Sequence, residues 1–138
     1  MKLELTSLES AISSLERSIK ASATYEATLP PDLKETVRSG IIQNFEVAYE
    51  QAWKMMKRWL ETNISAESVD GVTRRELFRQ AAENRLIDDV DLWMSFHAAR
   101  NEASHTYDND AAEEVSKSAE HFVAVVQSFL ASLRTRND

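Results

Sequence analysis

One short stretch of this sequence brings together side chains that suit phosphate chemistry. It runs from Arg100 to Tyr107 and contains an arginine, a histidine at position 105 and a tyrosine. Arginine carries a permanent positive charge on a planar guanidinium group, which can bind a phosphate through two hydrogen bonds. Histidine can donate or accept a proton near neutral pH. These residue types indicate a site that handles a phosphate-containing molecule.

The position of Arg100 on its predicted helix raises the question of what pairs with it. At about 100° per residue, Arg100 projects between Trp93 and Phe96, on the face that should be buried. A buried arginine is costly unless an acidic side chain pairs with it. We therefore expect an ion pair with Glu46 or Glu50 on an earlier helix, and a purely structural role for that pair stays open.

Glu46 and Glu50 lie on neighbouring turns of one helix face, so both can point toward the same partner. They either form simple ion pairs with Arg100 or Lys54, or they fix the orientation of the arginine at a functional site. We interpret them as supporting groups rather than as catalytic ones.

His105 lies five residues after Arg100, about 140° around an ideal helix. The two side chains converge only if the helix ends or bends near Ser104, or if Arg100 reaches across. The polar run that follows His105 favours a helix end at this point.

The remaining candidates for metal or proton chemistry are weak. His97 and His121 fall on or beside apolar faces, where a packed or surface imidazole is the simpler interpretation. Glu102 and His105 fit the Glu-x-x-His pattern of paired-metal bundles, but such bundles use it twice and this chain has one copy. We expect no metal site and no cofactor.

Composition predicts an all-helical fold. Only two glycines and two prolines occur in 138 residues, far below the average usage of about 7% and 5%, so tight-turned sheets are disfavoured. A hydrophobic content of 43% is enough for one core, and we expect a single domain over residues 1–138. The absence of cysteine excludes disulfides, and the lack of a long apolar run or signal peptide favours a cytoplasmic location.

Hydrophobic periodicity predicts five helices along the chain. Their starts are marked by capping patterns: Thr6 with Glu9, Asp32 with Glu35, Thr73 with Glu76, Asp88 or Asp89, and Asp110 with Glu113. The clearest apolar stripes are Ile42, Phe45, Tyr49, Ala52, Met56 and Trp59 in the second helix, and Val115, Ala119, Phe122, Val126, Phe129 and Leu133 in the fifth. We interpret Trp53 and Trp59 as core or interface residues rather than base-stacking platforms.

The net charge of −7 weighs against general coating of nucleic acid, which needs a clustered basic surface. The basic residues form two groups, Lys54, Lys57 and Arg58, then Arg74, Arg75, Arg79 and Arg85. Each group taken alone is typical of a solvated helix face. Binding of a short or locally held RNA stays open.

Two stretches resemble a known family, the HEPN proteins (higher eukaryotes and prokaryotes nucleotide-binding), in their small prokaryotic branch of nucleotidyltransferase substrate-binding proteins. The segment 41–54 is similar to that branch's Phe-Glu-x-x-Tyr-Glu-x-x-Trp-Lys helix. Arg100, Asn101, His105 and Tyr107 match the branch's arginine, polar residue, spaced histidine and later tyrosine. The resemblance covers essentially the whole chain.

This resemblance implies a five-helix up-and-down bundle, with four long helices forming the core, that pairs into a homodimer. It implies a metal-independent ribonuclease site at the dimer interface, in which Arg100 holds the scissile phosphate, His105 transfers a proton and Asn101 orients one of them. The protein would be the toxin of a toxin–antitoxin pair, and a minimal nucleotidyltransferase antitoxin would attach adenylate to Tyr107. A second alternative is a non-catalytic subunit that presents a nucleotide or substrate to the nucleotidyltransferase, and a third is a structural bundle without chemistry.

Overall fold

The computed structural model describes residues 2–105 and 107–137, and these residues form helices and turns but no strand. The five α-helices are α1 (Thr6–Tyr25), α2 (Pro31–Asn63), α3 (Arg74–Glu83), α4 (Val90–Glu102) and α5 (Asn109–Thr135). Two short 3-10 turns, η1 (Glu26–Thr28) and η2 (Ala103–His105), follow α1 and α4. The predicted all-helical fold with five helices is confirmed.

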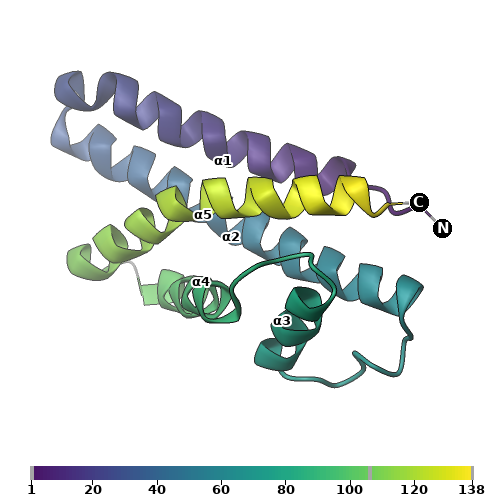
Figure 1. The fold of residues 1–138 in the computed structure, drawn as a ribbon. Helices are drawn as coiled ribbons and strands as arrows, with labels where there is room; N and C mark the ends of the chain where they lie inside the picture. The colour runs from purple at the N-terminus through teal and green to yellow at the C-terminus, as the bar shows by residue number, and fades with distance from the viewer. Residues whose placement is uncertain (1, 106, 138) are drawn as a thin grey trace.

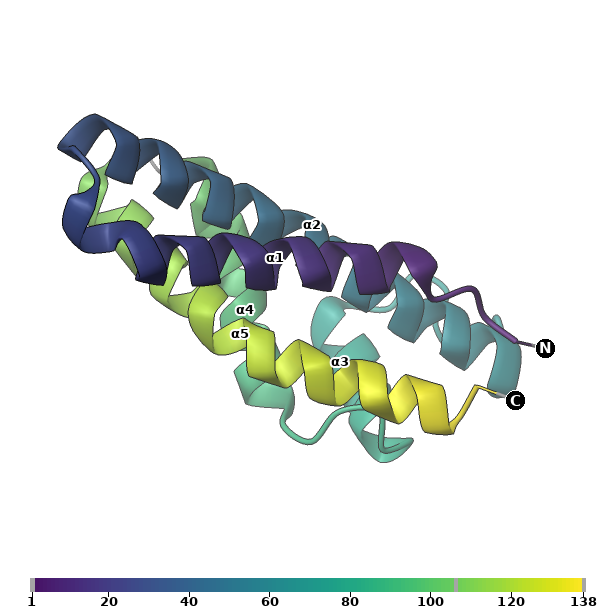
Figure 2. The same cartoon turned by 90° about the horizontal axis from the view of Figure 1, so that it is seen from above.

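The three longest helices run side by side and the two shorter ones pack against their flank. α1 and α2 form an antiparallel hairpin, and α5 lies along both of them (Figures 1 and 2). α4 crosses the long helices and contacts α2 and α5, while α3 contacts α2 and α4. The two chain ends meet, because Leu3 N donates to Asn137 Oδ1 at 2.7 Å and Asn137 Nδ2 donates to Leu3 O at 3.0 Å.

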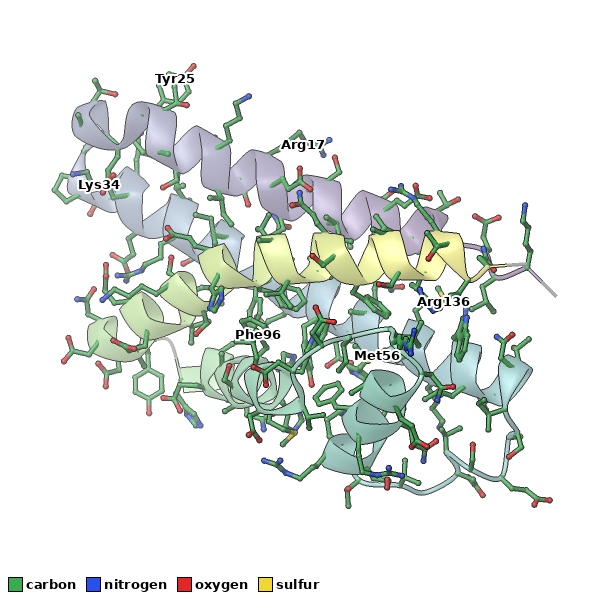
Figure 3. All side chains as sticks on the ribbon, in the orientation of Figure 1. Arg17, Tyr25, Lys34, Met56, Phe96 and Arg136 are labelled. Carbon is green, nitrogen blue, oxygen red and sulfur yellow. The ribbon has the colours of Figure 1, made fainter. Side chains whose placement is uncertain are left out.

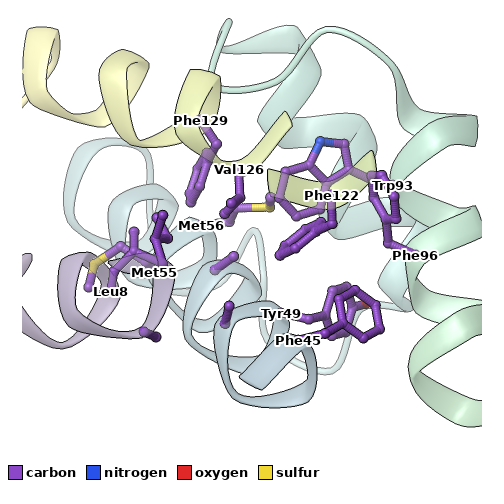
Figure 4. Packing of buried hydrophobic residues seen from close by; sticks show 14 of the residues in the cluster. Leu8, Phe45, Tyr49, Met55, Met56, Trp93, Phe96, Phe122, Val126 and Phe129 are labelled. Atoms are coloured by element: carbon purple, nitrogen blue, oxygen red, sulfur yellow. The ribbon is translucent and has the colours of Figure 1, made fainter. Parts of the chain in front are cut away.

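An aromatic cluster holds α4 to α2 and α5. The Phe122 ring lies 4.9 Å from Phe96, 5.3 Å from Phe45 and 5.5 Å from Trp93, each in an edge-on arrangement that aromatic pairs prefer (Figure 4). The predicted stripes of the second and fifth helices are buried throughout. The helix that carries Arg100 is thus fixed by its apolar face.

The side chains divide cleanly between this core and the outer surface. Met56 and Phe96 are buried between the helices, whereas Arg17, Tyr25 and Lys34 project outward (Figure 3). No helix in the described part of the chain is long and apolar enough to cross a membrane.

Two of the predicted helix starts are confirmed by their hydrogen bonds. The Thr73 hydroxyl accepts from Glu76 N at 3.1 Å at the start of α3, and Asp89 Oδ1 accepts from Leu92 N at 3.0 Å at the start of α4. These caps fix where the two helices that flank α2 begin.

Three predicted capping boxes are wrong. Leu5 precedes α1 in the N-cap position, and the Thr6 hydroxyl bonds to the Glu4 side chain instead. α2 begins at Pro31, where the missing N–H costs no helical hydrogen bond, so Asp32 is not a cap. Asp108 caps α5 by accepting from Asp110 N at 2.9 Å, two residues before the predicted start.

The buried face of α4 also differs from the predicted one. Trp93, Phe96 and Ala99 point into the core, and Ala103 continues this face into η2. Arg100 lies at its edge with 31% of its side chain exposed. Because α2 and α5 both pack on α4, the buried face is displaced by one residue toward Ala99, which leaves the arginine half-buried.

Candidate functional site

Arg100 is anchored between two carboxylates of α2. Its Nη1 lies 3.3 Å from Glu46 Oε2 and its Nε lies 3.4 Å from Glu50 Oε1, so the expected ion pair forms with both glutamates. The Nε is shielded from solvent and makes no hydrogen bond to a described residue, so the contact with Glu50 is electrostatic. The outer edge of the guanidinium group stays accessible and can bind an anion.

A groove of about 540 Å³ opens beside this arginine on the surface of α2. Its lining combines both glutamates with apolar and amide side chains: Ser39, Ile42, Gln43, Glu46, Val47, Glu50, Gln51 and Arg100. Val47 is an exposed apolar residue at this position. The arginine therefore faces a concave surface rather than an isolated patch of helix.

Glu50 connects the arginine to a second cationic side chain on α3. Trp53 Nε1 donates to Glu50 Oε2 at 3.1 Å, and the guanidinium carbon of Arg74 lies 3.5 Å from the centroid of the Trp53 ring. Sequence reasoning assigned Arg74 to a solvated helix face and missed this stack. The available signal was its position at the start of a helix, where a cation is unfavourable.

A hydrogen bond between Tyr49 and His97 joins α2 to α4 below the arginine. The Tyr49 hydroxyl lies 2.8 Å from His97 Nδ1. Burial raises the pKa of the Tyr49 phenol, whereas burial and the nearby charges of Arg74 and Arg100 lower the pKa of His97. Both shifts favour the neutral forms of the two side chains, and His97 is a packed imidazole, as the sequence predicted.

His105 and Tyr107 lie beyond the end of α4 on the surface. The α-helix ends at Glu102, which confirms the expected break near Ser104, and η2 carries His105 to an exposed position. The rings of His105 and Tyr107 are 6.3 Å apart and nearly perpendicular, and Tyr107 is 90% exposed. Among the described residues, no hydrogen bond or ion pair joins Arg100 to His105.

Asn101 makes no side-chain hydrogen bond to another described residue. It is exposed, and its backbone carbonyl accepts from Ser104 Oγ at 2.9 Å in the turn that ends α4. In the described residues, no three His, Asp or Glu side chains gather closely enough to hold a metal ion.

Comparison with known proteins identifies the family. Residues 3–135 match the family model described as nucleotidyltransferase substrate binding protein like. The chain belongs to this family. The HEPN membership predicted from the 41–54 and 100–107 stretches is thereby confirmed.

The chain has matches from Haemophilus influenzae both in sequence and in structure. A protein named probable ribonuclease HepT is 32% identical over 139 residues, covering 99% of this chain and 95% of the relative. A solved structure described as the fold of a substrate binding domain of a nucleotidyltransferase has a TM-score of 0.91 at 30% identity, covering 95% of this chain and 99% of that one.

A solved structure from Thermus thermophilus has the same fold as this chain. It has a TM-score of 0.72 at 23% identity and covers 92% of this chain and 98% of its own. The roles assigned to Arg100, Asn101, His105 and Tyr107, and to the supporting glutamates, stay predictions.

Proposed function

We propose that this HEPN protein is an endoribonuclease that works without a metal ion, through Arg100 and His105. The observation that carries the proposal is an arginine anchored by two carboxylates but open at its outer edge, followed by an exposed histidine just past the helix end. The name of the Haemophilus influenzae relative, probable ribonuclease HepT, supports the same activity.

The chemistry needs a cation and a proton-transfer group. A 2′-hydroxyl attacks the adjacent phosphorus, and the bond from phosphorus to the 5′-oxygen breaks. A base takes the 2′-hydroxyl proton and an acid protonates the leaving 5′-oxygen. Arg100 stabilises the negative charge that develops on the phosphate oxygens. His105 supplies one proton transfer, and a second copy of the chain supplies the other His105 across a homodimer interface.

The proposed partner is a minimal nucleotidyltransferase that acts as antitoxin. Tyr107 projects into solvent near the His105 ring, so its hydroxyl is accessible to a modifying enzyme. Each adenylate attached there adds bulk and negative charge beside a site built for phosphate, which blocks RNA. Mass spectrometry after incubation with the partner and ATP should show added adenylate on the parent and none on Tyr107→Phe.

The decisive experiment incubates the purified protein with cellular RNA in excess EDTA. We expect cleavage by the parent and at least a hundredfold slower cleavage by Arg100→Ala and by His105→Ala, since a positioned acid or base contributes about 10²–10⁴-fold. Arg17→Ala and His121→Ala are matched controls, because both side chains are exposed and lie on other helices. Cleavage that persists in both site variants would refute the assignment.

A second function, a non-catalytic subunit that binds a nucleotide for the nucleotidyltransferase, is favoured by two observations about charge. The chain carries a net charge of −7, and two carboxylates already share the site arginine. Both features weaken binding of a long RNA more than binding of a single nucleotide. ATP binding without any RNA cleavage would favour this function.

A further inference from the structure

Arg74 is a half-buried cation that has no acidic partner among the residues that the structure describes. Five other arginines lie within 4.0 Å of a carboxylate: Arg38, Arg75, Arg79, Arg100 and Arg134. Arg74 forms no such pair with any described residue, and its Nε is buried without a hydrogen-bond partner. In a chain with 23 acidic residues, an uncompensated guanidinium group at this depth needs an explanation.

The place of Arg74 in its helix makes it still less favourable. It is the first residue of α3, directly after the Thr73 cap, where the positive end of the helix dipole disfavours a cation. Its neighbour Arg75 meets the same dipole but pairs with Asp91 at 2.9 Å. Arg74 instead lies against the face of Trp53, which attracts a cation and fixes the plane of the guanidinium group.

The same contacts connect Arg74 to the candidate site. Trp53 donates to one oxygen of Glu50, and the other oxygen of Glu50 lies 3.4 Å from Arg100 Nε. α3 and α4, which carry the two arginines, both pack against α2 (Figure 1). Both arginines also lower the pKa of His97, so their positive potentials overlap in one region.

We propose that Arg74 binds a second phosphate of the RNA strand whose scissile phosphate is held at Arg100. This inference rests on the proposed ribonuclease function. Stacking on Trp53 uses the face of the guanidinium group, and because the Nε is buried, the terminal Nη donors are the ones that can reach phosphate oxygens. An RNA strand offers phosphates at regular intervals, so one strand can bind both arginines, which are linked through Trp53 and Glu50.

The test measures equilibrium binding of a fluorescent single-stranded RNA, with His105→Ala as the background so that the RNA is not consumed. In that background, adding Arg74→Gln should weaken RNA binding about tenfold. It should also reduce the slope of log affinity against log salt by about 0.7, which is the contribution of one phosphate contact to binding of a single strand. Arg75→Gln removes the same charge from the next residue, which is exposed, and should change affinity less than about twofold. Thermal unfolding of each variant checks that the fold is intact.

The outcomes separate this inference from the function on which it rests. If the background protein binds RNA and adding Arg74→Gln changes neither the affinity nor the salt slope, the role of Arg74 is overturned. The ribonuclease proposal then still stands. No RNA binding by the background protein would overturn both. If Arg74→Gln loses ATP binding but keeps its RNA binding, Arg74 belongs to a nucleotide site. That result would overturn its assignment to an RNA phosphate.

A second variant keeps the test valid if Arg74→Gln does not fold. Arg74→Lys retains the charge but loses the planar stack, so the salt slope should stay near that of the background protein while affinity falls. If Arg74→Lys binds RNA as tightly as the background protein does, the role given to the Trp53 stack is contradicted.

Discussion

At the scale of single residues, the balance of charge around Arg100 sets what the site can bind. Glu46 and Glu50 lie 3.3 and 3.4 Å from its guanidinium nitrogens, while about a third of each side chain stays exposed to solvent. The carboxylates orient the arginine but also compete with a phosphate for it. Neutralising one of them should therefore change binding and turnover in opposite directions.

Glu46→Gln tests this competition directly. We expect RNA to bind several-fold more tightly because a negative charge beside the guanidinium group is removed. We expect kcat to fall about tenfold because the arginine is held less firmly. Steady-state kinetics separates the two effects, and Glu67→Gln, an exposed glutamate in the loop after α2, is the matched control. Weaker RNA binding by Glu46→Gln would contradict the competition.

His97 should make stability depend on pH. Its pKa in the folded protein is lowered, mainly by burial and further by Arg74 and Arg100, from an ordinary value of 6.5. The unfolded chain therefore binds the proton more tightly, so protonation favours unfolding. The free energy of unfolding should be insensitive to His97 above its unfolded pKa and should fall as the pH drops from about 6.5 toward the folded pKa.

Urea unfolding at a series of pH values between about 5 and 8 measures this effect. His97→Gln should lose this component of the pH dependence while keeping the part that carboxylates contribute. An identical pH profile in the variant and the parent would show that the Tyr49–His97 pair does not titrate as described.

At the scale of elements, the sequence predicts what α2 and α5 bury better than where the helices begin. The apolar stripes of α2 and α5 are strongly periodic, and all their residues are buried. Capping residues are ambiguous because several Asp and Thr residues stand near each start. At α2 the sequence could not show that Pro31 would occupy the first helical position and displace the predicted Asp32 cap.

The start of a helix marks Arg74 as an unfavourably placed cation, but its stacking partner Trp53 could not be predicted, for a different reason. These residues are far apart in the sequence, and their contact depends on how α3 packs against α2. Likewise, the ion pairs of Arg100 were predicted, but its half-exposed position was not, because α2 and α5 together determine which face of α4 is buried.

The caps give a prediction at this scale. Thr73→Ala should lower the free energy of unfolding by about 1 kcal/mol, because the hydroxyl satisfies the backbone N–H of Glu76. Asp32→Ala should cost only a few tenths of a kcal/mol, because Asp32 makes no capping bond and interacts only with the helix dipole. Denaturant unfolding measures both, and a larger loss at Asp32 than at Thr73 would contradict the assigned caps.

At the scale of the whole molecule, one chain places His105 past the end of α4 and Arg100 in a groove on α2, with no hydrogen bond or ion pair between these described residues. One chain supplies a single His105, whereas the proposed cleavage uses a second histidine of this kind as the other proton-transfer group. The proposed homodimer, in which two such sites face each other, supplies that group and covers the groove. Dimerisation is thus part of the proposed mechanism rather than a separate property.

Val47→Glu tests the dimer through the groove. Val47 is 46% exposed and lines the groove beside Arg100, so a charge there should disrupt pairing of two copies and abolish cleavage with helicity unchanged. Ile64→Glu places the same charge on a 54% exposed apolar side chain just past the end of α2 and should leave both properties intact. Sedimentation velocity gives the oligomeric state, and a monomeric parent at micromolar concentration would refute the composite site.

The central claim is that Arg100 and His105 cleave RNA by attack of a 2′-hydroxyl, without a metal ion. The most direct measurement is the chemical identity of the ends of RNA cut in excess EDTA, compared between the parent, Arg100→Ala and His105→Ala. We predict fragments ending in a 2′,3′-cyclic phosphate from the parent and almost none from either variant. Intact RNA with the parent, or the same ends formed equally by both variants, would contradict the claim.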